Sequence, residues 1–297
     1  MPQEQAETTV AVVGAGLSGL VAARDLHRHG VEVLVLEAAD RLGGRALSET
    51  TALGSRVDLG GQWIGHDHHR MMALAKELGV PRYAMHTSPM PTIIDGSRRV
   101  RVASPAVLGA VLALVGVETL SRVGAPDRWN DTTVAAWLRR VPGRTARRLL
   151  EVVALISWTS DLDRHSVRAM AEMVKLQGGV RTMLSTSGGA QESLLVEGVG
   201  ALVDGVAAEL GARVRPGTRV TSIVQRRDGV TLFTATGEVR AQKVIVAVPP
   251  PMAARIAHDP PLPAARVDTE QHSYMGSVFK AIAVYERPFW RDRGSGE

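Results

Sequence analysis

The sequence contains no cysteine, and aromatic residues make up only 4% of its 297 positions. Without cysteine the chain has no disulfide and no thiolate metal site. The net charge is +5, and arginines occur in short pairs such as Arg98-Arg99, Arg147-Arg148 and Arg226-Arg227. Because no basic run is interleaved with aromatic residues, we interpret these pairs as solvated faces and expect no nucleic-acid binding.

Long apolar runs are also missing. The longest run, residues 106–117, is shorter than the roughly 20 residues that a membrane-spanning helix needs, so we expect a buried helix there and no membrane span. The N-terminal residues MPQEQAETT lack the charged and apolar segments of a secretory signal, and the expected compartment is the cytoplasm. With 45% hydrophobic residues, the chain is expected to bury a core in one large or two interleaved domains.

The first 30 residues have a strand, a glycine turn and a helix pattern. The apolar run Val10–Val13 predicts a buried parallel strand, and the helix-period segment that follows stops at Gly30. Three glycines between them have distinct expected roles. Gly14 permits a tight turn, Gly16 lets the backbone approach a pyrophosphate, and Gly19 lets the helix pack closely on the strand. The helix N-terminus then offers amide hydrogens to phosphates.

A carboxylate follows at the position that a dinucleotide site requires. The second apolar run, residues 31–36, ends on Glu37, which lies 18 positions after Gly19 and so close to the expected spacing of roughly 20. Glu37 would accept hydrogen bonds from ribose hydroxyls, and its charge would repel the 2′-phosphate of NADP. A GxGxxG motif alone is weak evidence, but this context predicts a dinucleotide site.

Two further glycine-rich segments narrow the identity of the dinucleotide. In the first, two glycines are flanked by arginines that suit a pyrophosphate: Arg41, Gly43, Gly44 and Arg45. The second, DLGGQWIG at residues 58–65, offers bare backbone to a flat ligand. The segment E-x3-R-x-GGR followed by DLGGQWIG resembles the flavin-containing amine oxidase family, the monoamine and polyamine oxidases. That resemblance implies FAD rather than NAD.

The resemblance continues through the GGAQE stretch, the strand ending in VPPP and the MG-x3-K-x4-Y-x2-PFW stretch. It implies an α/β fold with a Rossmann-like FAD-binding domain, containing a parallel sheet and a β-meander, over residues 1–88 and 200–270. A largely helical α+β substrate lobe would occupy residues 89–199 and 271–297. Family members continue well past this point, so we expect the lobe to be incomplete and the chain truncated. Because no cysteine is present for a flavin linkage, FAD is expected to bind noncovalently.

Periodicity and turn residues predict the other elements. The expected helices are residues 69–78, 106–122, 132–140, 145–157, 166–176 and 201–210. An Asp-Gly pair at 95–96 predicts a hairpin, and residues 213–248 predict a meander with turns at 216–217, 228–229 and 236–237. The last strand of this meander, 243–248, is expected to join the flavin sheet. Alternating residues predict a final strand over 277–285.

The resemblance also assigns roles outside the flavin turn. Lys280 matches a family lysine that contacts flavin N5 through a water molecule, and a lysine in an apolar alternating segment favours a site role over a solvent-facing one. Gln191 matches a position that lines the substrate cavity, although a glutamine after two glycines also suits a turn. Leu184 matches a residue between the entrance and inner cavities. The expected cofactor-binding residues are Gly14, Ala15, Gly16, Ser18, Gly19, Glu37, Arg41, Gly43, Gly44, Arg45, Gly60, Gly61, Gln62, Trp63 and, through its backbone, Val220.

Other constellations favour structural readings. The cluster of His66, Asp67, His68 and His69 lies in a polar loop without a remote ligand pair, so we predict no metal site. The Ser18 hydroxyl is expected to cap the helix or touch phosphate rather than to act as a nucleophile. Asp161 and Asp163 are expected in loop and N-cap positions.

The sequence therefore predicts an FAD-dependent amine oxidase that uses O2 and releases hydrogen peroxide. One alternative is a catalytically silent flavin-binding fragment, or a subunit completed by a separate C-terminal half. Another is a flavoprotein of the protoporphyrinogen oxidase or carotenoid desaturase type, which would resemble this chain mainly in its first 45 residues. The expected partners are a small amine and O2, and a homodimer is compatible with the sequence.

Overall fold

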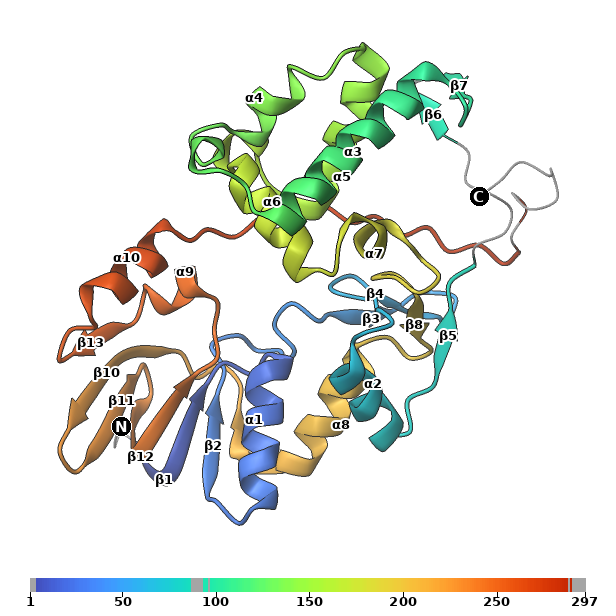
Figure 1. Cartoon of the computed structure of the whole chain (residues 1–297). Coiled ribbons are helices and arrows are strands. Elements are labelled where there is room, and N and C mark those ends of the chain that lie inside the picture. The colour runs from blue at the N-terminus through green and yellow to red at the C-terminus, as the bar shows by residue number, and fades with distance from the viewer. Residues whose placement is uncertain (1–3, 87–92, 96, 288, 290–297) are drawn as a thin grey trace. The chain divides into compact units, whose positions relative to one another are not determined.

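The computed structural model describes residues 4–86, 93–95, 97–287 and 289. It contains two compact units, each built from segments that are distant in the sequence (Figure 1). The sheet unit consists of Met1–Gln62, Met72–Arg82 and Leu195–Met275. The helical unit consists of Trp63–Met71, Tyr83–Leu194 and Gly276–Glu297. Two short strands, β5 (Arg82–Ala84) and β8 (Ser193–Leu195), lie where the chain changes from one unit to the other.

The sheet unit is organised around a seven-stranded sheet of order β13-β10-β11-β12-β1-β2-β9. The strand bounds are β1 Glu4–Val13, β2 Val33–Leu36, β9 Val214–Arg215, β10 Val220–Arg226, β11 Gly229–Thr234, β12 Gly237–Val246 and β13 Ala257–Asp259. Strand β1 pairs in parallel with β12 and with β2. The β10, β11 and β12 strands form an antiparallel meander. These pairings confirm the predicted α/β class and its meander.

Strand β1 lies inside the sheet because apolar residues fill both of its faces near its end. The exposed fraction of each residue in Val10–Val13 is 7% or less, as expected for a parallel strand covered on both sides. The strand begins earlier than predicted, since residues 4–8 already pair with residues 237–241 of β12. The predicted strand 243–248 is the second half of the same β12, which runs without a break from Gly237.

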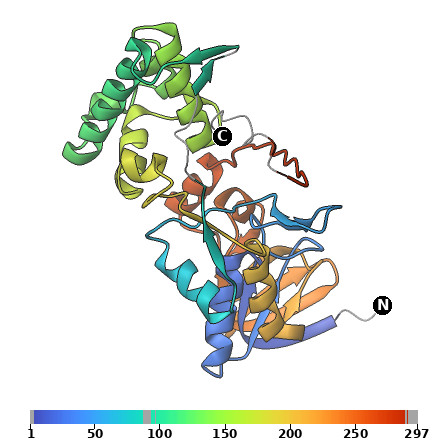
Figure 2. The same ribbon diagram turned by 90° about the vertical axis from the view of Figure 1, so that its right-hand side faces the viewer.

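Helices cover the sheet and fix the position of the first turn. Their bounds are α1 Leu17–Arg28, α2 His69–Glu77, α8 Gly200–Leu210, α9 Pro250–Ala253 and α10 Ala264–His272. Figures 1 and 2 show α1 and α8 side by side. Arg24 of α1, only 5% exposed, forms ion pairs with Glu77 of α2 and Glu209 of α8 at 3.2 and 3.5 Å. The three helices are therefore held together by a shared charge cluster as well as by apolar packing.

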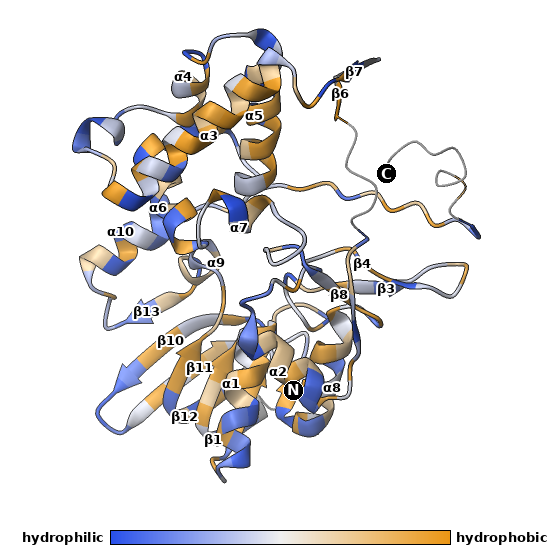
Figure 3. Ribbon diagram, turned by 45° about the vertical axis from the view of Figure 1, so that its right-hand side comes forward, coloured by the Kyte–Doolittle hydropathy of each residue, from blue (hydrophilic) through white to orange (hydrophobic). Residues whose placement is uncertain are grey.

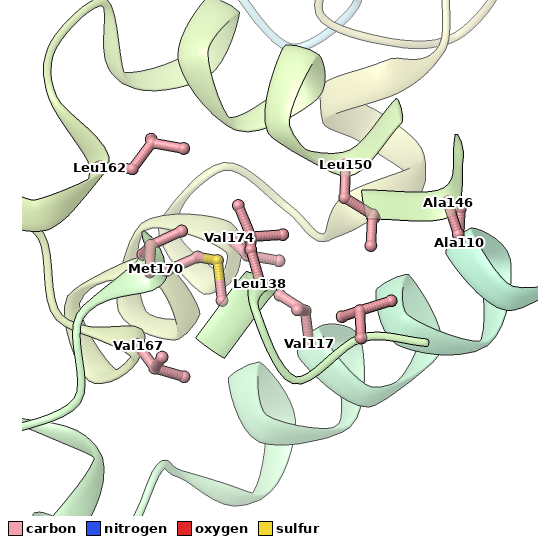
Figure 4. Close-up of a cluster of buried hydrophobic side chains, with 11 residues drawn as sticks. Ala110, Val117, Leu138, Ala146, Leu150, Leu162, Val167, Met170 and Val174 are labelled. Atoms are coloured by element: carbon pink, nitrogen blue, oxygen red, sulfur yellow. The ribbon is translucent and has the colours of Figure 1, made fainter. Parts of the chain in front are cut away.

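The helical unit confirms the predicted series of helices. Its elements are the hairpin β6 Ile93–Asp95 and β7 Arg98–Val100, followed by α3 Pro105–Val123, α4 Val134–Leu138, α5 Arg144–Trp158, α6 Val167–Leu176 and α7 Val180–Leu184. Its core packs α3 against α5 and α6, with Val117, Leu150 and Val174 among the buried side chains (Figure 4). Ser166 caps α6 by accepting the amide hydrogen of Ala169, and Asp161 is the N-cap of the short 3-10 helix Leu162–Arg164.

The apolar run at 106–117 does form a helix, as predicted, but the prediction that this helix is buried is wrong. Among the described residues, one helix, α3, is long and apolar enough to cross a membrane, with a mean hydropathy of 1.7 in its 18-residue window, yet only 17% of that window is buried. The side chains of Leu108, Val111, Leu112 and Val115 are exposed, and most of the α3 ribbon is orange, the colour of hydrophobic residues, in Figure 3. Apolar composition alone does not say which face of a helix has a neighbour.

The predicted strand at 277–285 is also wrong. Residues 277–285 have no strand assignment in the described part of the chain, and Val278 and Phe279 are 68% and 94% exposed. An alternating sequence forms a strand only when a neighbouring strand accepts its backbone hydrogen bonds. The related PFW motif falls partly outside the described residues, because Pro288 and Trp290 are not among them.

The helical unit contains one histidine whose burial predicts a pH dependence of stability. His165 stacks on Trp158 with ring centroids 3.8 Å apart, and its Nε2 lies 2.6 Å from the Ser160 hydroxyl. Burial, with a smaller contribution from the charge of Arg164, lowers the pKa of His165 below its ordinary value of 6.5. The folded state therefore binds this proton less readily than the unfolded state, and stability falls as pH drops below about 6.5.

We expect His165→Gln to reduce this pH dependence. Thermal unfolding of the wild type and the variant between pH 7.5 and 5.5 gives the difference directly, since other groups titrate in both proteins. A difference that grows steadily toward low pH, with the wild type losing more stability, is the expected result. Parallel curves would show that His165 does not titrate differently on folding.

Candidate functional site

The turn after β1 brings the first glycines into contact with the end of β12. Gly14 has a positive φ of 103°, and an added Cβ would lie 2.7 Å from a methyl group of Val248. Gly19 is packed more tightly, because its Cβ would meet the carbonyl oxygen of Gly14 well inside van der Waals contact and the Cβ of Ala247 at 3.2 Å. These two positions therefore need glycine for the turn and for close packing of α1 on the sheet.

Gly16 differs from its neighbours because a Cβ there would meet nothing within 4 Å. It is the N-cap residue of α1, with no side-chain cap and no acidic residue in the first helical turn. The amide hydrogens at this helix end are therefore available to an anion. Ser18 lines the same space and does not cap the helix, which leaves phosphate contact as its predicted role.

The second glycine segment lies directly on the first. The amide of Gly43 donates to the carbonyl of Ala15 at 2.8 Å, and a Cβ on Gly44 would lie 3.3 Å from the Cα of Gly16. The Arg41 guanidinium donates to the Gly44 carbonyl at 2.9 Å. Arg45 lines the open space beside both segments. Arg41 does not line this space, and its contact is with the backbone of the loop itself. The two sequence motifs thus form one surface.

The DLGG segment contacts the backbone at Arg45 and the start of α8. The Asp58 carboxylate accepts the backbone amide hydrogen of Val199 at 2.9 Å, at the start of α8. A Cβ on Gly60 would overlap the carbonyl oxygen of Arg45, and Gly61 donates to that carbonyl at 3.0 Å. Neither Gly60, Gly61 nor Gln62 is among the residues lining the cavity described below, and Trp63 belongs to the helical unit. Their contact with cofactor stays a prediction.

Glu37 closes the site at the end of β2. One carboxylate oxygen accepts the amide hydrogen of Ala15 and the other accepts that of Ala39, both at 2.8 Å. A carboxylate offers about four lone-pair positions, so each oxygen keeps one for a ribose hydroxyl. Glu37 thus forms part of the wall of the cavity described below, and its ribose contact stays a prediction.

A cavity of about 820 Å³ lies in the sheet unit at the turn after β1. Eight of the residues predicted to bind cofactor line it: Gly14, Gly16, Ser18, Glu37, Gly43, Gly44, Arg45 and Val220. Sequence reasoning missed the far wall, formed by Pro249, Pro250, Met252, Arg255 and Ile256. That wall follows the end of β12, and ligands of open α/β sheets bind beyond the carboxyl ends of their strands. The predicted strand at 243–248 could therefore have located this wall, because the residues after its carboxyl end are expected to meet a ligand.

Lys280 lies in the helical unit, in the extended segment that follows Gly276. The Ser277 amide donates to the Thr159 carbonyl at 2.9 Å, which fixes the start of this segment. Thr159 is in the left-handed region at φ 54°, an unfavourable conformation for a β-branched residue. A Cβ on Gly276 would overlap the Thr159 side chain and lie 2.7 Å from its carbonyl oxygen. Gly276 therefore lets the segment carrying Lys280 approach the end of α5.

If this chain oxidises an amine, as the family resemblance implies, Gly276→Ala should lower amine-dependent turnover about tenfold or more, since displacing a positioned group by about 1 Å has effects of this size or larger. The unfolding temperature should fall only slightly, because Gly276 and Ser277 are exposed and this segment can move away from Thr159. Ser277→Ala keeps the backbone amide and is the matched control, with turnover close to wild type. Equal turnover in both variants would show that the contact with Thr159 does not position Lys280.

The two predicted substrate residues lie in different surroundings. Leu184, 44% exposed at the end of α7, lines a small apolar cavity of about 50 Å³ in the helical unit with Trp137, Trp158 and Met183. Gln191 is half-buried in the loop after Gly189 and does not line that cavity. The structure places neither Lys280 nor Gln191 beside Leu184 in this cavity, and all three substrate-site assignments stay predictions.

Comparison with known proteins identifies the family. The model of the family "Flavin containing amine oxidoreductase" matches residues 17–297. AofH of Mycobacterium tuberculosis, which carries the name of a flavin-containing monoamine oxidase, is 36% identical over 96% of this chain. Human amine oxidase [flavin-containing] B is 32% identical over 96%. A putrescine oxidase structure with putrescine bound superposes with a TM-score of 0.87 and 26% identity over 98% of this chain and 69% of its own.

The match covers only part of each relative, 66% of AofH and 58% of the human protein. The family model matches this chain from Leu17, the first residue of α1, to residue 297. The chain therefore belongs to the family of flavin containing amine oxidoreductases.

Proposed function

We propose that this chain is an FAD-dependent amine oxidase. It converts a primary or secondary amine to an imine while O2 is reduced to hydrogen peroxide. Hydrolysis of the imine then gives an aldehyde or ketone and the free amine or ammonia. The main support is the 820 Å³ cavity at the β1–α1 turn, in a chain whose family is flavin-containing.

Family membership confirms the flavin cofactor, and the cavity fits the dinucleotide form of it. Gly16 leaves open space at an uncapped helix N-terminus, which suits a pyrophosphate. Glu37 has lone pairs for a ribose, and Arg45 adds a positive charge beside the same space. With no cysteine in the sequence, binding is proposed to be noncovalent.

When bound, FAD would supply the acceptor for the two electrons that leave the carbon–hydrogen bond next to the amine nitrogen. The protein residues bind and orient the cofactor. Gly14, Gly16 and Gly43 admit the phosphates, Glu37 holds the adenosine end, and Val220 lines the same cavity. Lys280 is proposed to supply a polar contact at the reacting end. We propose no particular amine, because the relatives include proteins named as monoamine oxidases and as putrescine oxidases.

FAD binding without amine oxidation is a second candidate function. It is favoured by the exposure of the Lys280 segment, in which Val278 and Phe279 have 68% and 94% of their surface open to solvent. A reacting site excludes water from its neighbourhood, and this segment by itself does not.

Amine-dependent peroxide formation separates the two functions. The purified chain is incubated with FAD and a panel of primary, secondary and diamine substrates, and peroxide is measured with a coupled peroxidase. Catalase-treated samples and samples without FAD serve as controls. Peroxide formation that needs both FAD and an amine is the expected result. FAD binding with no peroxide from any amine would reject oxidase activity for this chain and leave the second candidate.

A further inference from the structure

A polar hollow of about 840 Å³ lies in the helical unit, away from the residues assigned so far. It is formed by the end of α4, the first three turns of α5 and the short 3-10 helix Leu162–Arg164. Charged residues dominate its lining: Arg139, Arg144, Arg147, Arg148, Arg164, Glu151, Asp161 and Asp163. We call it the arginine hollow. Its lining has five arginines and three acids, a net formal charge of +2.

Three of these arginines have no partner among the residues that the structure describes. Among the described residues, the guanidinium groups of Arg139, Arg144 and Arg147 make no hydrogen bond or ion pair, although three carboxylates line the same hollow. The Nε of Arg147 is buried without an acceptor. A buried donor without an acceptor is destabilising, so a ligand that supplies an acceptor is favoured. Arginines elsewhere in this unit do find carboxylates, as Arg122 does with Glu118 and Arg168 with Glu172.

The start of α5 makes the hollow more positive. Its N-cap is Gly143, which provides no side-chain cap, and the first turn contains no acidic residue. Arg144 and Arg147 lie instead at this end of the helix. Positive side chains are unfavourable there, because the unpaired amide hydrogens already carry partial positive charge. An anion held by these guanidinium groups would offset this concentration of positive charge.

We propose that the arginine hollow binds the phosphate group of a phosphorylated molecule. Guanidinium groups form paired hydrogen bonds with phosphate oxygens, and several arginines converging on one space suit a dianion better than a single carboxylate. The volume is within the usual range for small-molecule sites. The proposal is independent of the flavin cavity, which belongs to the sheet unit and is lined by different residues.

Calorimetric titration of the FAD-saturated chain tests the proposal. The probes are inorganic phosphate, pyrophosphate and glycerol phosphate at constant ionic strength, with chloride as the reference anion, and saturation with FAD blocks the pyrophosphate site. We expect one site whose affinity falls about tenfold or more in Arg147→Gln, the loss of a charge-assisted contact. Arg144→Gln is the second variant, in case Arg147→Gln does not fold.

The matched control is Arg181→Gln, which removes the same charge from α7, outside the hollow. It should bind every probe as the wild type does. Vesicles of phosphatidylglycerol in phosphatidylcholine distinguish the source of the phosphate. Vesicle binding that glycerol phosphate displaces identifies a lipid headgroup, whereas glycerol phosphate binding without vesicle binding identifies a soluble phosphate. The proposal is overturned if no probe binds, or if Arg181→Gln weakens binding as much as Arg147→Gln and Arg144→Gln.

Discussion

Replacing Gly16 with alanine is expected to weaken FAD binding about 10- to 100-fold while leaving the protein folded. The new methyl group meets no protein atom within 4 Å, and the backbone of Gly16 has an ordinary φ of −67°. The fold therefore tolerates it. The space it enters is the space proposed for the pyrophosphate, where overpacking costs roughly 1–3 kcal/mol. Thermal unfolding first checks that the variant is folded, and fluorescence titration with FAD then measures its affinity.

Gly19→Ala is the contrasting variant. Its methyl group would overlap the Gly14 carbonyl, so we expect stability itself to fall by about 3 kcal/mol or more, whether or not FAD is present. Gly116→Ala in α3 is the neutral control, since nothing lies within 4 Å of that position and alanine favours a helix. If Gly16→Ala bound FAD as tightly as Gly116→Ala, the cofactor phosphates would not lie against this turn.

Lys280→Met is expected to lower the amine-dependent reduction rate about a hundredfold with little change in FAD affinity. Methionine keeps the length and apolar stem of lysine and removes the ammonium group. The expected size follows from removing one polar contact that acts on the reacting atoms. Stopped-flow measurement of flavin reduction at saturating amine isolates this step from binding.

Lys175→Met makes the same change on α6 of the helical unit, where Lys175 is exposed. Its reduction rate should match the wild type. If Lys280→Met also reduced at the wild-type rate, the role that the family resemblance assigns to Lys280 would be wrong. A loss of FAD affinity in place of a loss of rate would make Lys280 a binding residue.

The flavin turn could be predicted from the sequence because its determinants are local. Gly14, Gly16, Gly19 and Glu37 lie within 24 consecutive residues, and each acts through backbone geometry or a spacing that survives in any βαβ unit. The residue types required by a tight turn are few, so they leave a readable pattern. The contact between Gly43 and Ala15 extends the same logic to the next loop.

The remaining features depend on neighbours that local sequence does not specify. Arg255 reaches the flavin cavity only because β12 pairs in parallel with β1. The exposed face of α3 and the missing strand at 277–285 have the same cause, since burial and strand pairing both need a second element. The short helix α7 was missed because a run of five residues has too little periodicity to detect.

The central claim is that this chain holds FAD at the β1–α1 turn and passes electrons to it from an amine. The most direct test is the visible absorption spectrum of the purified chain, recorded after addition of FAD and removal of excess, and again after anaerobic addition of an amine mixture. We predict retained flavin bands that bleach when amine is added. Bands that persist with every amine would contradict amine oxidation, and the absence of retained flavin would contradict the binding site itself.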